Sequence, residues 1–207
     1  MNNPYSELMA DKEAHEQPSQ RALGRYWLEK YHPRSVLDLG CGTGGYLIEF
    51  WSAKAGVLGV DSCPNAGALL PQGAFICYDI ADFEPGRKYD MALCIEVAEH
   101  LQPELSDQLV SALCASADRI VFSAAPPGQG GINHINCRPM AEWLGMFSNH
   151  NFYTDSEGTR QLRAFLQQPV FDGVPWLRTN MREIVKGATS PPEVLTPNLG
   201  DIRLQDG

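Results

Sequence analysis

The sequence lacks an excess of basic residues and any apolar run long enough to form a membrane helix. Its 207 residues contain 16 Lys and Arg against 25 Asp and Glu, which gives a formal net charge of -9. This charge argues against long-range attraction to nucleic acid or to anionic lipid surfaces. No stretch approaches the roughly 18 consecutive apolar residues that indicate a membrane-spanning helix. We therefore expect one soluble domain that acts on a small neutral or cationic partner.

The sequence also lacks closely spaced cysteines. It has six, at positions 41, 63, 77, 94, 114 and 137, with no CxxC pair and no short disulfide framework. The N-terminal segment MNNPYSELMADKEAHEQ has neither the basic start nor the apolar run of a signal peptide. These absences predict a cytoplasmic protein whose cysteines are reduced and serve as small buried fillers.

The hydrophobic pattern predicts an α/β fold. Residues 5–31 are expected to be helical in two pieces interrupted by Pro18. After Pro33, short apolar runs alternate with helical segments, which is typical of a doubly wound parallel sheet with helices on both faces. The expected strands are 35–39, 57–60, 74–78, 89–95, 119–123, 151–154 and 181–186, and the expected helices are 43–53, 64–69, 103–116, 139–148 and 158–168.

Three parts of the chain are expected. Residues 1–32 would form N-terminal covering helices, and residues 33–187 would form the ligand-binding α/β domain. Residues 188–207 hold three prolines and little periodicity, so we predict a flexible tail there.

A glycine-rich turn follows the first expected strand, in the sequence VLDLGCGTGG at residues 36–45. Glycines allow a sharp turn and a close approach of the backbone to a ligand. Gly40, Gly42 and Gly45 also satisfy the dinucleotide pattern GxGxxG, so the glycines alone do not choose a cofactor. The candidate ligand contacts in this turn are Gly40, Cys41, Gly42, Thr43 and Gly44.

Acidic residues at the ends of three consecutive strands narrow the choice. Asp38 would repel a pyrophosphate and attract a cationic amine. Asp61, next to Ser62, could accept both hydroxyls of a ribose, and Asp79, next to Ile80, could accept from an adenine amine. Each acid could instead cap a turn or a helix. Together they favour an extended, positively charged nucleoside.

The segment VLDLGCGTG, followed by GVD and YDI in order, resembles the class I S-adenosylmethionine-dependent methyltransferases over about residues 20–186. The resemblance implies a Rossmann-like sheet of seven strands, mostly parallel, whose last strand is antiparallel. It also implies that S-adenosylmethionine binds across Gly40–Gly44, Asp61 and Asp79.

A second constellation lies in the segment EVAEH after the fourth expected strand. In a helical turn Glu96, Glu99 and His100 can point into one cleft, and His134 comes from the loop after the next strand. Two carboxylates and two imidazoles could hold Mg²⁺, Mn²⁺, Fe²⁺ or Zn²⁺. Alternatively, Glu96 borders the cofactor, Glu99 and His100 pair or cap a helix, and His134 orders its loop. His134 or His100 could also act as a general base without metal.

The EVxEH segment resembles that of ubiquinone-biosynthesis O-methyltransferases and small-RNA 2′-O-methyltransferases. The resemblance implies a metal that holds the accepting hydroxyl. The matching positions are Glu96, Glu99, His100 and His134. The gap between the first three and His134 is shorter here than in the RNA enzymes. We predict methyl transfer to a small-molecule oxygen, with nitrogen less favoured, and with Glu96, His100 and His134 as catalytic candidates. The alternatives are an RNA 2′-O-methyltransferase, which the acidic charge disfavours, and a non-catalytic S-adenosylmethionine-binding scaffold.

Overall fold

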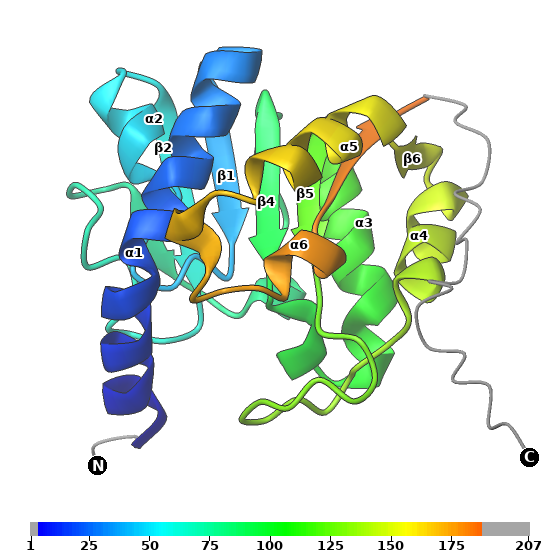
Figure 1. Ribbon diagram of the computed structural model, residues 1–207, viewed down its shortest axis with the longest axis horizontal. Coiled ribbons are helices and arrows are strands. Elements are labelled where there is room, and N and C mark those ends of the chain that lie inside the picture. The colour runs from blue at the N-terminus through cyan, green and yellow to red at the C-terminus, as the bar shows by residue number, and fades with distance from the viewer. Residues whose placement is uncertain (1–3, 188–207) are drawn as a thin grey trace, which may run out of the picture.

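A computed structural model describes residues 4–187, which form one seven-stranded sheet with helices on both faces (Figure 1). The strand order is β3-β2-β1-β4-β5-β7-β6. Strand β7 runs antiparallel to both of its neighbours, whereas the other pairs are parallel. The strands are β1 Ser35–Leu39, β2 Gly56–Asp61, β3 Phe75–Cys77, β4 Met91–Ile95, β5 Arg119–Ser123, β6 Phe152–Thr154 and β7 Arg182–Lys186. The predicted Rossmann-like fold is confirmed.

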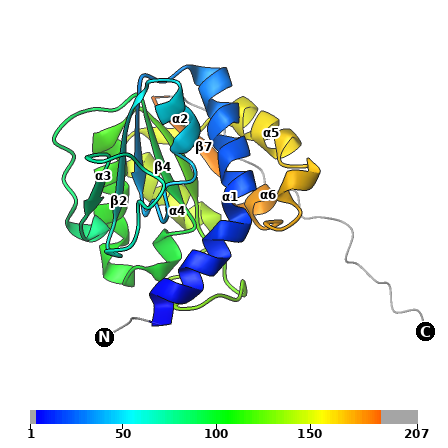
Figure 2. The same ribbon diagram turned by 90° about the vertical axis from the view of Figure 1, so that its left-hand side faces the viewer.

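The helices range from long α-helices to single 3₁₀ turns. The α-helices are α1 Pro4–Tyr31, α2 Ile48–Ser52, α3 Ser106–Ser116, α4 Met140–Asn149, α5 Ser156–Phe165 and α6 Leu177–Asn180. Short 3₁₀ turns are η1 Ile80–Asp82, η2 Ala98–His100, η3 Pro103–Leu105 and η4 Pro169–Phe171. Helix α1 runs across the outside of the sheet beside α2 and α6 (Figure 2).

Two hydrophobic clusters hold the layers together. On one face Leu37 and Cys94 of the sheet pack with Trp143 of α4. On the other face Val36 and Leu93 pack with residues of α1, α2 and α5. Successive residues of β1 and β4 therefore enter opposite clusters, as the period of two in a strand requires. This explains why β4 is apolar throughout, and β1 apolar except at Ser35 and Asp38, rather than alternating.

Helix α1 is one continuous helix, so the predicted break at Pro18 is wrong. Proline removes one backbone hydrogen bond, but its fixed φ is compatible with a helix. Leu23 and Trp27 of α1 are fully buried against the sheet, and this packing anchors the helix beyond the proline. The predicted division at residue 32 stays a prediction, and the predicted tail, residues 188–207, lies outside the described residues.

Two predicted helices differ from the structure. Helix α2 begins only at Ile48, because Gly44 in the preceding turn has a φ of 90° that an α-helix cannot include. The predicted helix 64–69 is a series of turns, in which Gly67 with a φ of 69° donates its N–H to the Gly42 carbonyl. Helix α6 was not predicted, since its four residues are too few to show a period.

The cysteines are less uniform than predicted. All six are free, as expected, but only Cys41, Cys94 and Cys114 are buried. Cys77 is exposed, because β3 lies at the edge of the sheet. Across the described residues, none of the helices combines the length and the apolar composition needed to cross a membrane.

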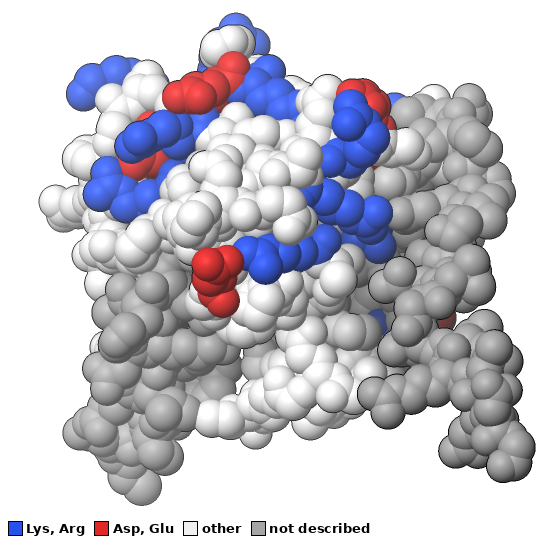
Figure 3. All heavy atoms as spheres, in the orientation of Figure 1, with Lys and Arg blue, Asp and Glu red and all other residues white. Residues whose placement is uncertain are grey.

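Lys and Arg side chains gather on the face that carries α1, α5 and α6 (Figure 3). Several are held in ion pairs: Arg21 and Arg25 with Glu49, and Arg178 with Asp172. The loop after β5, residues 124–136, contains no Lys or Arg. The loop that carries the candidate residue His134 is therefore free of basic side chains.

Candidate functional site

The glycine-rich turn after β1 lies where the structure leaves no room for larger residues. Gly40 has a φ of 80°, and a Cβ atom there would lie 2.4 Å from Cγ2 of Val97. At Gly44, with a φ of 90°, a Cβ atom would lie 2.5 Å from Cγ of Leu70. Gly40 and Cys41 both donate their N–H groups to the Val60 carbonyl. The turn is thus fixed between β2 and the start of the segment after β4.

Asp61, at the end of β2, holds this turn directly. One carboxylate oxygen accepts the Gly42 N–H at 3.0 Å, and the other accepts the Cys63 N–H at 2.8 Å. Each carboxylate oxygen can accept about two hydrogen bonds, so one position on each remains for a ligand. The predicted ribose role and the alternative turn-capping role are therefore compatible in the same side chain.

Asp38 lies in β1 directly below the turn and is almost completely buried, with 1% of its surface exposed. Its Oδ2 atom has no hydrogen-bond partner among the described residues. Burial raises the pKa of Asp38 to about 8, and the nearby Asp61 carboxylate adds to the rise. A buried acceptor without a partner is costly, and a cationic donor placed beside it would remove that cost.

The remaining predicted cofactor contacts surround the same edge of the sheet. Asp79 and Ser62 are exposed, and Ile80 is buried at the start of η1. Asp79 lies just beyond the end of β3 rather than within it. Thr43 has a buried hydroxyl oxygen without a hydrogen-bond partner among the described residues. The structure thus places these residues at the carboxyl ends of β1, β2 and β3, where open α/β sheets bind ligands.

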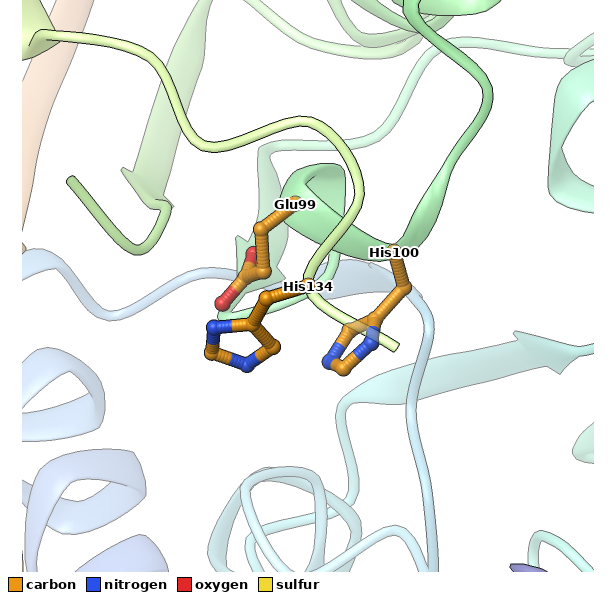
Figure 4. Close-up of side chains that lie close together, drawn as sticks. All are labelled: Glu99, His100 and His134. Atoms are coloured by element: carbon orange, nitrogen blue, oxygen red, sulfur yellow. The ribbon is translucent and has the colours of Figure 1, made fainter. Parts of the chain in front are cut away.

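Glu99, His100 and His134 come together beyond the end of β4 (Figure 4). One potential ligand atom from each lies within 4.8 Å of the others. Glu99 and His100 belong to η2, and the Glu99 carboxylate points toward the His134 ring. The two imidazole rings are edge to face, with centroids 4.9 Å apart.

Backbone hydrogen bonds fix this group in place. The Glu99 carbonyl accepts the N–H groups of Ile135 and Asn136, both at 3.0 Å. Gly131 leaves space for His134, because a Cβ atom there would lie 2.1 Å from Nε2 of the imidazole. The loop after β5 is therefore attached to η2 directly after the histidine.

Glu96 lies outside this group, although the sequence places it among the candidate metal ligands. Its carboxylate accepts the side-chain amides of Gln129 at 3.0 Å and Asn180 at 3.1 Å. Its backbone φ of 55° is in the left-handed region, which is uncommon for a residue other than glycine.

No sequence pattern indicated three further polar residues at this edge. Gln129 lies in the same loop after β5 as His134, but no feature of the sequence indicated Gln129 itself. Asn180 comes from α6, more than 80 residues after Glu96, and no local pattern connects them. Gln20 of α1 is 8% exposed, and its Oε1 atom, which has no hydrogen-bond partner among the described residues, fills the space above Gly45.

A doubly wound sheet with a glycine turn and acids at three strand ends defines a nucleoside-binding α/β protein of the Rossmann-like class. Residues 11–127, more than half of the chain, match the family model described as a methyltransferase domain. The chain belongs to this methyltransferase family, and its fold is that of the class I S-adenosylmethionine-dependent methyltransferases.

Solved structures share the fold. The sugar N-methyltransferase KedS8 from Streptoalloteichus sp. ATCC 53650 is 16% identical, with a TM-score of 0.59 over 83% of this chain and 88% of that one. Magnesium protoporphyrin IX methyltransferase from Synechocystis PCC 6803, solved with bound S-adenosylhomocysteine, is 21% identical, with a TM-score of 0.56 over 86% of each chain.

A curated relative matches in sequence over part of its length. The magnesium-protoporphyrin O-methyltransferase of Synechocystis sp. is 33% identical over 107 residues, which are 46% of this chain and 46% of that protein. The match therefore spans about half of the relative.

Proton release on binding S-adenosylmethionine is expected from the burial of Asp38. At pH 7 most of the ligand-free protein should carry a protonated Asp38, because its pKa is raised to about 8. A cationic amine beside the carboxyl group would lower that pKa, so binding should release up to about one proton. Calorimetry at pH 7 in two buffers of different ionisation enthalpy measures this release.

Asp38→Asn is the control, since the amide cannot release a proton, and equal heats in both buffers for the parent protein would contradict the expectation.

The raised pKa of Asp38 also affects the stability of the ligand-free protein. The folded pKa lies above the unfolded value of about 3.9, so the native state holds an extra proton between about pH 4 and pH 8. The stability of the ligand-free protein should fall as the pH rises through that window, by at most about 1.4 kcal/mol per pH unit.

Proposed function

We propose that this enzyme transfers the methyl group of S-adenosylmethionine to an oxygen of a small molecule, and that Glu99, His100 and His134 serve the accepting oxygen. The proximity of these three side chains carries the proposal. The part-length relative is an O-methyltransferase, which supports an oxygen acceptor. The net charge of -9 and the absence of Lys and Arg from residues 124–136 favour a small molecule over RNA.

The chemistry asks little of the protein beyond alignment and proton removal. The sulfonium methyl is already activated, so the site must place the acceptor in line with the sulfur–carbon bond and exclude water. The loop that carries His134 is hydrogen-bonded to η2, which holds the imidazole at the site. One of its ring nitrogens can take the proton of a hydroxyl acceptor. His100, edge to face with it, is the second candidate for this role.

The same three residues fit a divalent ion. Imidazole nitrogens and a carboxylate oxygen suit Zn²⁺, Mn²⁺ and Fe²⁺. Bonds of about 2.1 Å require ligand atoms within roughly 4 Å of one another, so the observed 4.8 Å limit needs only small side-chain movements. Nδ1 of His134 is buried without a hydrogen-bond partner among the described residues. A bound ion would lower the pKa of the accepting hydroxyl and orient it.

Transfer of a labelled methyl group tests the function. The protein is incubated with methyl-labelled S-adenosylmethionine and either a small-metabolite fraction or short RNA duplexes. We expect label in the small-metabolite fraction, in a product from which mild alkali releases methanol if the acceptor is a carboxylate and does not if it is a hydroxyl. Label in RNA alone would instead support the RNA 2′-O-methyltransferase alternative, and N-methyl products alone would contradict the proposed oxygen acceptor.

The metal arm of this experiment uses chelation and one matched pair of variants. EDTA should abolish transfer, and calorimetric binding of Mn²⁺ or Zn²⁺ should weaken about 100-fold or more in His134→Ala, because a direct ligand is removed. His150→Ala, at an exposed position after α4, should bind metal like the parent. Full transfer after chelation, without measurable metal binding, would leave His134 or His100 as a metal-free base.

A further inference from the structure

The Glu96 carboxylate is held by two side chains from distant parts of the chain. Oε2 accepts from Nε2 of Gln129 at 3.0 Å, and Oε1 accepts from Nδ2 of Asn180 at 3.1 Å. Nδ2 of Asn180 also donates to Oε1 of Gln129 at 2.9 Å, which closes the triangle. The Glu96 N–H donates to the carbonyl and the hydroxyl of Ser123, both at 3.1 Å. The side chain is therefore fixed at the backbone and at both oxygens.

These partners orient the carboxylate without cancelling its charge. Both are neutral amides, and within the part of the chain whose side chains are described Glu96 forms no ion pair with Lys or Arg. Each oxygen accepts one hydrogen bond and can accept about one more. Glu96 is half-buried, whereas Asn180 beneath it is 4% exposed. A negative charge is thus presented in a fixed position at the surface of the site.

The position of this charge relates it to the cofactor. Val97, the next residue, packs against Gly40 of the glycine turn, and β4 lies beside β1 in the sheet. Glu96 therefore stands between the glycine turn and the loop after β5 that carries His134. In methyl transfer the sulfonium of S-adenosylmethionine lies between the part of the site that binds the rest of the cofactor and the methyl acceptor.

Only one group of the cofactor changes its charge in the reaction. The acceptor's lone pair forms the new bond to the methyl carbon, and the electron pair of the broken sulfur–carbon bond stays on sulfur. The sulfonium thereby becomes a neutral thioether, while the amino and carboxylate groups keep their charges. A fixed carboxylate nearby attracts S-adenosylmethionine more than S-adenosylhomocysteine.

We propose that Glu96, positioned by Gln129 and Asn180, selects the charged S-adenosylmethionine over its neutral product S-adenosylhomocysteine. This inference rests on the proposed function only in that the enzyme uses this cofactor at the glycine turn. Glu96 is the residue that contacts the cofactor, and Gln129 and Asn180 are positioning residues. Loss of the attraction after transfer favours release of the product.

Calorimetric titration of the full chain with each compound tests the inference. The measured quantity is the Kd for S-adenosylhomocysteine divided by the Kd for S-adenosylmethionine. Glu96→Gln keeps the shape of the side chain and removes the charge, so this ratio should fall about tenfold, mainly through weaker binding of S-adenosylmethionine. Glu96→Asp keeps the charge and tolerates the positive φ, so it should retain most of the ratio.

Variants of the two amides separate positioning from a purely structural role. Gln129 lies in a loop, so Gln129→Ala should leave the fold intact. It should still lower the Kd ratio, by a smaller factor than Glu96→Gln does. Asn180→Ala should have the same effect. Glu29→Gln, an exposed charge change on α1, is the matched control and should not change the ratio. If Gln129 and Asn180 had only a structural role, their removal would weaken binding of both ligands equally and leave the ratio unchanged.

An unchanged ratio in Glu96→Gln, whether both ligands bind as before or both bind equally more weakly, would overturn the inference. If Glu96→Gln failed to fold, an unchanged ratio in Gln129→Ala would overturn it as well. The ratio does not require a known acceptor. An enzyme that shows the predicted ratio but methylates no small-molecule oxygen would refute the proposed function alone.

Discussion

Asp61→Ala is expected to weaken binding of S-adenosylmethionine by about 100-fold or more. The carboxylate holds the glycine turn through the Gly42 N–H and is expected to accept the ribose hydroxyls. Hydrogen bonds to a charged group contribute about 1.5–3 kcal/mol each, and about 1.4 kcal/mol corresponds to tenfold in affinity. Losing two of them, together with the anchor of the turn, gives an effect of this size.

Calorimetry with S-adenosylmethionine measures this loss. Asp118→Ala is the matched control, because Asp118 is exposed and lies at the amino end of β5, at the opposite edge of the sheet. We expect its affinity to equal that of the parent. A loss of less than about fivefold in Asp61→Ala would show that the carboxylate does not contact the ribose.

Glu183→Ala is expected to lower the free energy of unfolding by about 3–5 kcal/mol, the usual result of removing one partner of a buried ion pair. Glu183 lies in β7, has no exposed surface and accepts from Nε1 of Trp27 at 3.1 Å. Its other oxygen accepts from Lys30 at 3.2 Å and from Tyr31 and lies 4.0 Å from Arg119. Removing it leaves two cations and two donors without their shared acceptor.

Urea denaturation followed by circular dichroism measures this change. The control is Glu157→Ala on the exposed surface of α5, where the carboxylate pairs with Arg160, and we expect little change because exposed pairs contribute little. Similar stabilities for the two variants would show that α1 does not depend on Glu183 for its attachment to β7.

Much of the fold could be predicted because its causes are local. Apolar strands such as 35–39 and 119–123 carry their own signal, and buried parallel strands are apolar on both faces. The helix boundaries were less predictable, since Gly44 and Gly67 adopt left-handed conformations that depend on contacts with other segments. Pro18 predicts a break in the helix, because the sequence alone does not show how firmly Leu23 and Trp27 anchor α1.

The candidate site divides in the same way. Asp38, Asp61 and the glycine turn are marked by their place at strand ends, and the structure brings them together. Glu99, His100 and His134 could be grouped from spacing and loop order. The Glu96 contacts with Gln129 and Asn180 could not, because they join residues separated by tens of positions without any periodic pattern.

The sequence by itself determined the class of fold, the glycine turn and the acids at the strand ends, because each depends on neighbouring residues and on the fixed geometry of a parallel sheet. Its lack of basic charge already disfavoured a nucleic-acid partner. The tertiary structure alone decided which acids share a site and which groups hold them. It separated Glu96 from Glu99 and the histidines, because the directions of side chains depend on contacts between distant segments rather than on spacing along the chain.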